Sequence, residues 1–209
     1  MTPKRAILFD FDGTIIDSTK IVRNIISGLS QKYGLSKISE NDLRKARGKG
    51  FREILKDLGI SKSQIPFFIK DGRNEFGKNI DKVKIVKGIL KVLFELKKKD
   101  FILGVITSNS LKNIEYFLRK YNLNFFDYIN AGVSLFGKKR RIINFLKKNN
   151  LSKEDVIYIG DEVRDVESAK AAGVKAVAVC WGFNSEEILR KSNPDFMARK
   201  PSDLLKFCN

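Results

Sequence analysis

Hydrophobic residues gather along the chain in five short runs, which are separated by longer stretches of mixed polarity. Each run is nearly continuous in Val, Ile, Leu and Phe instead of alternating with polar residues: 6–11, 101–108, 126–133, 155–161 and 174–181. Uninterrupted runs of this length are typical of strands that are covered on both faces of a parallel sheet. We therefore predict a parallel sheet built from these five runs.

Helical patterns fill the spaces between the later runs. "SNSLKNIEYFLRKYNL", which begins at Ser108, and "GKKRRIINFLKKNN", which begins at Gly137, both place apolar residues at helical spacing. A third segment, "VRDVESAKAAGV", reaches Gly173, a residue that commonly ends a helix. Alternation of strand and helix predicts an α/β fold with an open, doubly wound, Rossmann-like sheet.

The stretch from 16 to 86 has a different pattern. It consists of helical segments broken by glycines, such as "DSTKIVRNIISGLSQKYGL" and "FREILKDLGIS", and it contains no convincing strand. We predict two parts: an α/β core made of residues 1–15 and 87–209, and a smaller, all-helical domain of residues 16–86 inserted into it.

The net charge and the absence of histidine limit the classes of function that the protein can have. The 209 residues hold 41 Lys+Arg against 24 Asp+Glu, a net charge of +17 that attracts anionic ligands in general. The lysines are spread through the predicted helices, and no basic stretch is interleaved with aromatic residues, so nucleic acid is disfavoured as a partner. Without histidine, Ser–His–Asp hydrolysis and histidine-ligated zinc are excluded. Catalysis would rest on carboxylates, lysines, hydroxyls and a hard metal ion.

The sequence also carries expectations about the compartment. No apolar run approaches the roughly 20 residues that a membrane-spanning helix needs, so we expect no membrane association. The N-terminal stretch lacks the pattern of a signal peptide. Two cysteines far apart, Cys180 and Cys208, form no disulfide framework, and we predict a cytoplasmic protein. Nothing in the pattern indicates an oligomeric state.

Polar side chains follow three of the predicted strands, and a pair of lysines begins a predicted helix. Since ligands of open α/β sheets gather at the carboxyl ends of the strands, we expect these residues to form one site. They are Asp10, Asp12 and Thr14 after the first run; Thr107, Ser108 and Asn109 after the second; Asp161, Glu162 and Asp165 after the fourth; and Lys138 and Lys139.

The chemistry of such a cluster points to phosphoryl transfer. Clustered carboxylates raise each other's pKa unless a cation intervenes, and Mg²⁺ typically takes one or two carboxylates plus phosphate oxygens. Asp10 can act as a nucleophile that forms an aspartyl-phosphate, while Asp12 protonates the leaving oxygen and later activates water. A hydroxyl at position 107 or 108 and the Lys138 ammonium would hold the phosphate oxygens.

Four motifs resemble those of the haloacid dehalogenase-like hydrolase superfamily: "DFDGT", "VITSN", a lysine at the start of a helix, and "IYIGDEVRD". Their order and spacing match, and the resemblance covers essentially the whole chain, with residues 16–86 as a helical cap after the first motif. "SLFGKKRRI" and "VIYIGDEVRDVESAKAAGVKAVAVCWGFNS" look most like phosphoglycolate-phosphatase-like members.

The resemblance implies a catalytic pair and a phosphate site. Asp10 would be the nucleophile, and Asp12 the general acid/base. Thr107 and Asn109 would bind the phosphoryl group, and Lys138 would steady the nucleophile and the phosphate. Lys139 remains an alternative to Lys138.

The same resemblance implies a Mg²⁺ site. Asp10 and the backbone carbonyl of Asp12 would bind the ion. Asp161 would complete the metal site, with Asp165 in its outer shell. Dehalogenases of the superfamily lack the second acid because no leaving oxygen needs a proton, so Asp12 argues for transfer of a phosphoryl group to water.

These expectations amount to a Mg²⁺-dependent phosphomonoester hydrolase that acts on a small anionic phosphorylated metabolite, for which 2-phosphoglycolate is one candidate. The cap cations Arg47, Lys49 and Arg52 could meet the far end of such a substrate, or they could form a solvated helix face. A phosphosugar mutase of the same superfamily and a nucleic-acid or nucleotide end phosphatase are the alternatives.

A rival motif predicts a different class of protein. "GVSLFGKK", residues 132–139, matches the phosphate-loop pattern of nucleoside triphosphatases except at its last position. There Lys139 replaces the hydroxyl that should hold Mg²⁺, which disfavours this class.

Overall fold

All five hydrophobic runs contain strands, and a sixth strand extends the sheet. The computed structural model describes residues 5–35, 39–132, 134 and 137–207. Within this part of the chain the main sheet has six parallel strands in the order β5-β4-β1-β6-β7-β8. The strands are β1 (Ala6–Phe9), β4 (Ile102–Ile106), β5 (Tyr128–Asn130), β6 (Val156–Gly160), β7 (Lys175–Val179) and β8 (Phe196–Ala198).

Strand β1 lies in the middle of the sheet, between β4 and β6. Its side chains alternate between two hydrophobic clusters: Ile7 and Phe9 belong to one, and Ala6 and Leu8 to the other. Because both faces of the strand are buried, its sequence is apolar at every position. From β1 the chain continues to β4 and β5 on one side, and then crosses to β6, β7 and β8 on the other side of β1. The strand order therefore reverses at β1, and its carboxyl end marks the point where ligands gather in such sheets.

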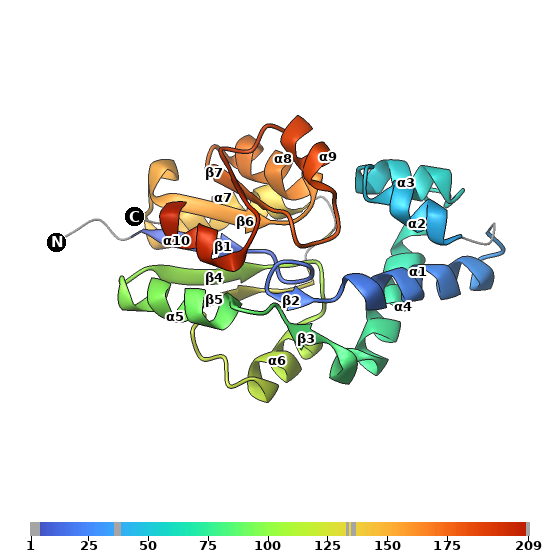
Figure 1. Cartoon of the computed structure of the whole chain (residues 1–209), viewed down its shortest axis with the longest axis horizontal. Coiled ribbons are helices and arrows are strands. Elements are labelled where there is room, and N and C mark those ends of the chain that lie inside the picture. The colour runs from blue at the N-terminus through green and yellow to red at the C-terminus, as the bar shows by residue number, and fades with distance from the viewer. Residues whose placement is uncertain (1–4, 36–38, 133, 135–136, 208–209) are drawn as a thin grey trace.

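Helices cover both faces of the sheet, as expected for a doubly wound fold (Figure 1). The first cluster is closed by α5 (Ile89–Lys98), α6 (Leu111–Lys120) and α10 (Leu204–Phe207). The second is closed by α7 (Lys138–Asn149), α8 (Val163–Ala172) and α9 (Glu186–Lys191). Short 3₁₀ turns complete the core: η1 (Ile80–Lys82), η2 (Lys153–Asp155) and η3 (Pro201–Asp203).

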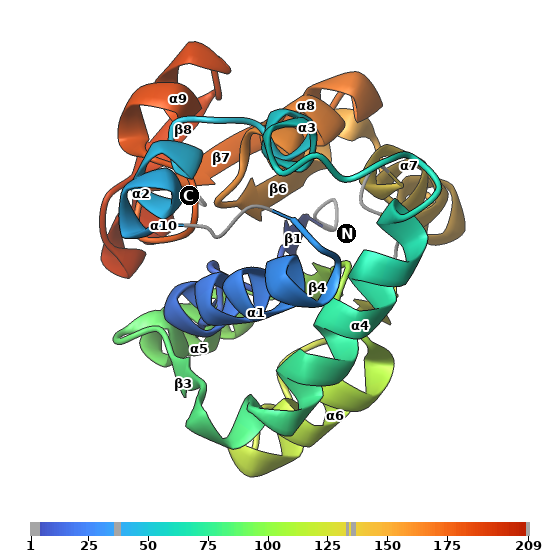
Figure 2. The same cartoon turned by 90° about the vertical axis from the view of Figure 1, so that its right-hand side faces the viewer.

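The remaining helices form what we call the cap segment, residues 19–78. It contains α1 (Thr19–Lys32), α2 (Glu40–Ala46), α3 (Phe51–Asp57) and α4 (Ile65–Lys78). These helices stand to one side of the sheet in Figure 1 and in front of it in Figure 2. α1, α3 and α4 enclose a small hydrophobic cluster of their own, formed by Leu29, Leu55, Ile60 and Phe68. No helix in the described part of the chain has the length and apolarity to cross a membrane.

Two short strands join the cap segment to the core, at the limits of the stretch in which no strand was expected. β2 (Ile16–Asp17) pairs antiparallel with β3 (Lys84–Ile85), and the Val86 N–H donates to the Ile15 carbonyl at 2.9 Å. A two-residue strand is too short to show alternation in the sequence. The pairing brings the two connections of the cap segment side by side.

Candidate active site

Asp10 and Lys138 form the centre of the site. Asp10 follows β1 directly, and its N–H donates to the Ile159 carbonyl of β6 at 2.7 Å. Lys138 is the first residue of α7 and is fully buried, whereas Lys139 points to solvent. The Lys138 Nζ lies 2.8 Å from Asp10 Oδ2 and 2.5 Å from Asp165 Oδ1. The structure thus brings Lys138, and not Lys139, to the predicted nucleophile.

Burial and charge set the protonation of this centre. Burial raises the pKa of Asp10 to about 7, although the neighbouring Lys138 charge acts in the opposite direction. Burial alone would lower the pKa of Lys138, but the charges of Asp10 and Asp165 hold that pKa well above its usual value. Lys138 is therefore a buried cation that faces carboxyl groups on two sides.

Asp161 lies at the end of β6, held by hydrogen bonds from two loops. Its Oδ1 accepts the Thr14 hydroxyl at 2.9 Å, and its Oδ2 accepts the Phe183 N–H at 2.7 Å. Two glycines leave room for this carboxylate. A Cβ at Gly13, where φ is +74°, would lie 2.3 Å from Asp161 Oδ2, and one at Gly182 would lie 2.2 Å from Asp161 Cβ. Any side chain at either position would displace the carboxylate.

Asp10, Asp161 and Asp165 can together hold a metal ion. Each offers a carboxylate oxygen, these oxygens lie within 4.8 Å of one another, and all three residues are buried. Burial, with the charges of Glu162 and Asp10, raises the pKa of Asp161 well above its usual value, so a divalent cation would relieve the repulsion. The donor set consists of hard oxygen ligands, which suits Mg²⁺, Ca²⁺ or Mn²⁺ better than a soft metal.

Asp165 also makes a hydrogen bond at the start of its own helix, α8. Its Oδ2 accepts the Glu162 N–H at 3.0 Å in a capping box at the start of the helix, while its Oδ1 meets Lys138. The same carboxylate therefore caps the helix and takes part in the site.

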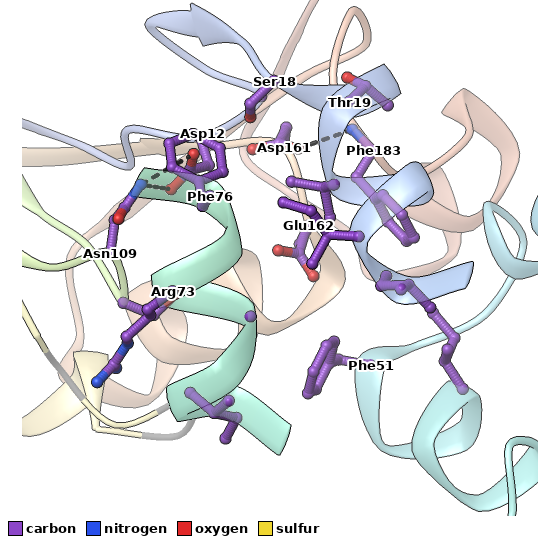
Figure 3. Close-up of a pocket in the computed structure, with 18 of the residues that line it drawn as sticks. Asp12, Ser18, Thr19, Phe51, Arg73, Phe76, Asn109, Asp161, Glu162 and Phe183 are labelled. Carbon is purple, nitrogen blue, oxygen red and sulfur yellow. Dashed lines mark hydrogen bonds between the residues drawn. The ribbon is translucent and has the colours of Figure 1, made fainter. Parts of the chain in front are cut away.

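Asp12 lies beside Asn109 at the floor of a cavity (Figure 3). The Asn109 Nδ2 donates to Asp12 Oδ2 at 3.0 Å. Burial raises the pKa of Asp12 to about 6, although hydrogen bonds from Asn109 and Ser18 lower it. A carboxyl group with this pKa is protonated part of the time near neutral pH, as a general acid must be.

The predicted phosphate-binding residues separate into two environments. Thr107 is fully buried, and its Oγ1 accepts the Asn109 N–H at 3.0 Å, so this hydroxyl fixes the turn after β4. Ser108 and Asn109 line the cavity. Ser110 caps α6 instead, because its hydroxyl accepts the Asn113 N–H at 3.3 Å.

The cavity lies between the strand ends and the cap segment and has a volume of about 180 Å³. Figure 3 shows its polar floor, with Asp12, Asn109 and Asp161, and an Arg73 side chain from α4. Arg164 of α8 also lines it. Its walls are otherwise mostly apolar side chains of α1, α3 and α4: Val22, Ile25, Ile26, Leu29, Phe51, Ile54, Phe68, Ile69 and Phe76.

None of the three predicted cap cations lines this cavity. Arg47 donates from Nε to the Phe183 carbonyl at 3.1 Å, Lys49 pairs with Glu53 and Asp57, and Arg52 is exposed. Arg73 and Arg164, which do reach the cavity, were missed because each is an isolated arginine within a helix. The contact of Phe183 with Asp161 was missed as well, since a backbone N–H carries no signal in the sequence.

The rival phosphate-loop interpretation gains no support from α7. This helix begins at Lys138, whose side chain is taken up by Asp10 and Asp165. Val133, Leu135 and Phe136 of that pattern lie outside the described residues.

The structure has a parallel Rossmann-like sheet with buried carboxylates and a lysine at its switch point, beneath an inserted set of helices. This combination is typical of one class of α/β proteins. The family model described as haloacid dehalogenase-like hydrolase matches residues 7–179. The chain belongs to this family, which confirms the resemblance of its motifs.

Known relatives span nearly the whole chain. It is 34% identical to a phosphoglycolate phosphatase of Synechococcus elongatus over 203 residues, covering 97% of this chain and 96% of that protein. It is 27% identical to the pyrophosphatase PpaX of Bacillus velezensis over 214 residues, covering 98% and 97%. Among solved structures, a haloacid dehalogenase-like hydrolase of Streptococcus pneumoniae has a TM-score of 0.81 at 26% identity, with full coverage of both chains.

Proposed function

We propose that this protein is a phosphomonoester hydrolase that works through an aspartyl-phosphate on Asp10. One observation supports this most directly: the buried Asp10 carboxyl meets the Lys138 ammonium at 2.8 Å, and a second acid, Asp12, lies two residues away at the cavity floor. A nucleophile, a cation for the phosphate and a separate proton donor are the groups that such a reaction needs.

The two carboxyl groups divide the chemistry. In the first step an Asp10 oxygen attacks phosphorus, the bond from phosphorus to the leaving oxygen breaks, and Asp12 donates a proton to that oxygen. In the second step Asp12 takes a proton from water, the water oxygen attacks phosphorus, and the bond to Asp10 breaks. The pKa of about 6 for Asp12 suits both directions of proton transfer.

The surrounding residues hold the phosphoryl group. Lys138 would face its oxygens as well as Asp10, which offsets charge that builds up in the transition state. Asn109 and Ser108 would donate hydrogen bonds from the cavity wall. Thr107 would keep this turn in place and donate its hydroxyl to the same group.

We propose Mg²⁺ as the metal of the site. The buried carboxylates of Asp10, Asp161 and Asp165 form the hard oxygen environment that this ion prefers. We propose Asp10, Asp161 and the backbone carbonyl of Asp12 as its ligands, with Asp165 in the outer shell. When bound, Mg²⁺ supplies positive charge to the phosphate oxygens. Asp161 is kept ready for it by Thr14 and the Phe183 N–H.

The substrate we propose is a small phosphorylated metabolite, with 2-phosphoglycolate as the first candidate. Support comes from the phosphoglycolate phosphatase to which the chain is 34% identical. A carboxylate at the far end of the substrate would need a cation in the cavity, and Arg73 and Arg164 are the arginines that line it. Arg47, Lys49 and Arg52 remain outside the cavity. Cytoplasmic location stays a prediction from cysteine usage.

A panel of phosphate compounds tests the substrate, with released phosphate as the readout. It contains 2-phosphoglycolate, pyrophosphate, sugar phosphates, nucleotides and a 5′-phosphorylated oligonucleotide. We expect the highest kcat/KM for 2-phosphoglycolate. Preference for pyrophosphate would favour the activity of the PpaX relative, and conversion of a sugar phosphate to its isomer without phosphate release would indicate a mutase.

The Asp10→Asn substitution tests the nucleophile. An amide of the same shape cannot form the acyl phosphate, so we expect kcat to fall by roughly a thousandfold or more. Asp100→Asn is a matched control, because this exposed residue has a φ of +59°, which asparagine tolerates. Near-normal turnover by the Asp10 variant would rule out the mechanism.

A further inference from the structure

The loop of residues 182–185, which we call the latch loop, touches both the candidate metal site and the cap segment. It follows β7 and leads into α9. At one end its Phe183 N–H donates to Asp161 Oδ2 at 2.7 Å, a contact drawn in Figure 3. The Asn184 N–H also faces the Asp161 carbonyl, at 3.3 Å. The position of Asp161 is therefore linked to the conformation of this loop.

Asn184 connects the loop to the cap segment through its side-chain amide, whose oxygen and nitrogen both make hydrogen bonds. The residue is 1% exposed. Its Oδ1 accepts the N–H of Val163, the first residue of α8, at 2.9 Å. Its Nδ2 donates to the carbonyls of Arg47 and Lys49 at 3.1 and 3.0 Å. Both cap carbonyls lie at the junction of α2 and α3, so one buried side chain joins that junction to the core.

The junction binds the loop from its own side as well. The Arg47 guanidinium donates from Nε to the Phe183 carbonyl at 3.1 Å and from Nη2 to the Gly182 carbonyl at 3.4 Å. In return, the Ser185 N–H donates to the Arg47 carbonyl at 2.8 Å. The contact is therefore reciprocal, and the same residue, Phe183, carries both an Arg47 contact and the Asp161 contact.

We propose that Asn184 is a positioning residue that links docking of the cap segment to the orientation of Asp161, a role that rests on the proposed phosphatase function. Movement of the α2–α3 junction away from the core would break both hydrogen bonds of the Asn184 Nδ2 together with those between Arg47 and the loop, and water replaces them only at a net cost. The loop would then relax and withdraw the Phe183 N–H from Asp161. Because such coupling is reciprocal, a cation that fixes Asp161 also favours the docked cap segment.

Two variants break the hydrogen bonds between the latch loop and the cap segment, one from each side. Asn184→Ala removes the amide on the core side, and Arg47→Gln removes the guanidinium on the cap side. Asn149→Ala is the matched control, since the Asn149 amide donates to the Phe145 carbonyl within α7 and takes no part in the contacts described above. Circular dichroism and thermal unfolding of each variant show whether it is folded.

Docking and metal binding are measured separately, and both without substrate. Chymotrypsin cleavage after Phe51, a half-buried residue at the start of α3 whose ring lies against the Arg164 guanidinium of the core, reports release of the α2–α3 junction, with the fragments identified by mass spectrometry. Fluorescence of Trp181, the only tryptophan, reports Mg²⁺ binding near Asp161, because its Nε1 donates to the Thr14 carbonyl and the Thr14 hydroxyl donates to Asp161. Mg²⁺ should slow cleavage of the wild-type protein.

We expect both latch variants to raise the cleavage rate and the Mg²⁺ dissociation constant by roughly tenfold and to lose the protection by Mg²⁺, with the control unchanged. The double variant should show little more than the larger single effect, as residues of one network do. An unchanged Mg²⁺ dissociation constant, or unchanged cleavage, in the folded variants would overturn the proposal. If Asn184→Ala does not fold, Arg47→Gln carries the test.

Failure of the proposed function has a different signature. If the wild-type protein hydrolyses none of the phosphate compounds but Mg²⁺ still protects it through Asn184, the role of Asn184 is supported and the phosphatase function is wrong. If it hydrolyses them but Mg²⁺ protects all variants equally, the phosphatase function is supported and the role of Asn184 is wrong.

Discussion

At the scale of single residues, Lys138 combines a structural and a chemical role. A lysine that is 1% exposed in its side chain is costly to bury unless its charge is paired, and here carboxyl oxygens of Asp10 and Asp165 lie 2.8 and 2.5 Å away. The ammonium group between them also offsets the repulsion between these two acids. Stability and reactivity therefore depend on the same ammonium group.

Replacing this lysine should damage both properties, while its neighbour should tolerate the change. Lys138→Met keeps the volume but leaves two buried carboxyl groups without their cation, so we expect a loss of about 3–5 kcal/mol in unfolding free energy. The kcat of the remaining folded enzyme should fall by roughly a hundredfold or more. Denaturant unfolding and phosphate release measure the two effects.

Lys139→Met is the control, since this side chain points to solvent. It should leave both quantities nearly unchanged. Equal effects of the two substitutions would contradict the assignment of Lys138 to the site.

The sequence predicts some site residues better than others for a physical reason. Asp10, Asp12 and Asp161 stand out because acids directly after a buried strand are unusual and costly. The choice between Lys138 and Lys139 stays open in the sequence, because it depends on the rotation of the first turn of α7. Arg73 is hidden for a similar reason, since only the packing of α4 against α1 decides which of its residues face the cavity.

At the scale of elements, the cap segment has to be stable enough to form one wall of the cavity. Its hydrophobic cluster of Leu29, Leu55, Ile60 and Phe68 is small, and it holds α1, α3 and α4 together. Phe68 is 6% exposed and stacks edge-on with Tyr33, with ring centres 5.4 Å apart. A cluster of this size makes the segment sensitive to the loss of a single side chain.

Phe68→Ala should therefore loosen the cap segment without unfolding the core. Truncation of a buried phenylalanine costs about 3–5 kcal/mol, which is large for such a cluster. Hydrogen–deuterium exchange should show faster exchange in α1 and α4 and unchanged protection in β1, β4 and β6. Phe67→Ala is the matched control, because the neighbouring side chain is 65% exposed. Loss of protection in the central strands would mean that the cap and core unfold as one unit.

Elements with a strong hydrophobic signal are the ones that the sequence predicts. Four of the five runs form the interior strands β4, β1, β6 and β7, and the fifth contains the edge strand β5. β8, also an edge strand of three residues, was missed because its short apolar segment is flanked directly by the charged Asp195 and Arg199. β2 and β3 were missed because two residues each leave no periodic pattern, although their pairing holds the cap segment at its base.

At the scale of the whole molecule, the fold brings several carboxyl groups that repel one another close together, where the sheet, the cap segment and the latch loop meet. The protein has a net charge of +17, yet its buried centre collects the carboxyl groups of Asp10, Asp161 and Asp165, with the half-buried Asp12 beside Asp10 in the sequence. Lys138 pairs directly with two of them, Asp10 and Asp165. The stability of the fold should therefore respond to pH and to metal ions together.

The sign of this response follows from the raised pKa values. Asp10 has a pKa of about 7 and Asp12 of about 6 in the folded protein, against 3.8 for a free side chain. Between pH 4 and pH 7 the folded state therefore binds more protons than the unfolded state, so these groups destabilise the protein as the pH rises through that window. Mg²⁺ binds the deprotonated, folded form, so its stabilising effect should grow over the same range.

We expect the metal-free protein, prepared with EDTA, to lose on the order of a few kcal/mol from these groups between about pH 5 and pH 8. Thermal unfolding of wild type and Asp10→Asn, with and without saturating Mg²⁺, isolates the contribution. The variant should gain stability relative to wild type as the pH rises, and Mg²⁺ should raise the wild-type Tm more at pH 8 than at pH 5. A Tm difference that is independent of pH, or a Mg²⁺ effect of equal size at both values, would mean that Asp10 is already ionised at pH 5 and that Lys138 alone neutralises it.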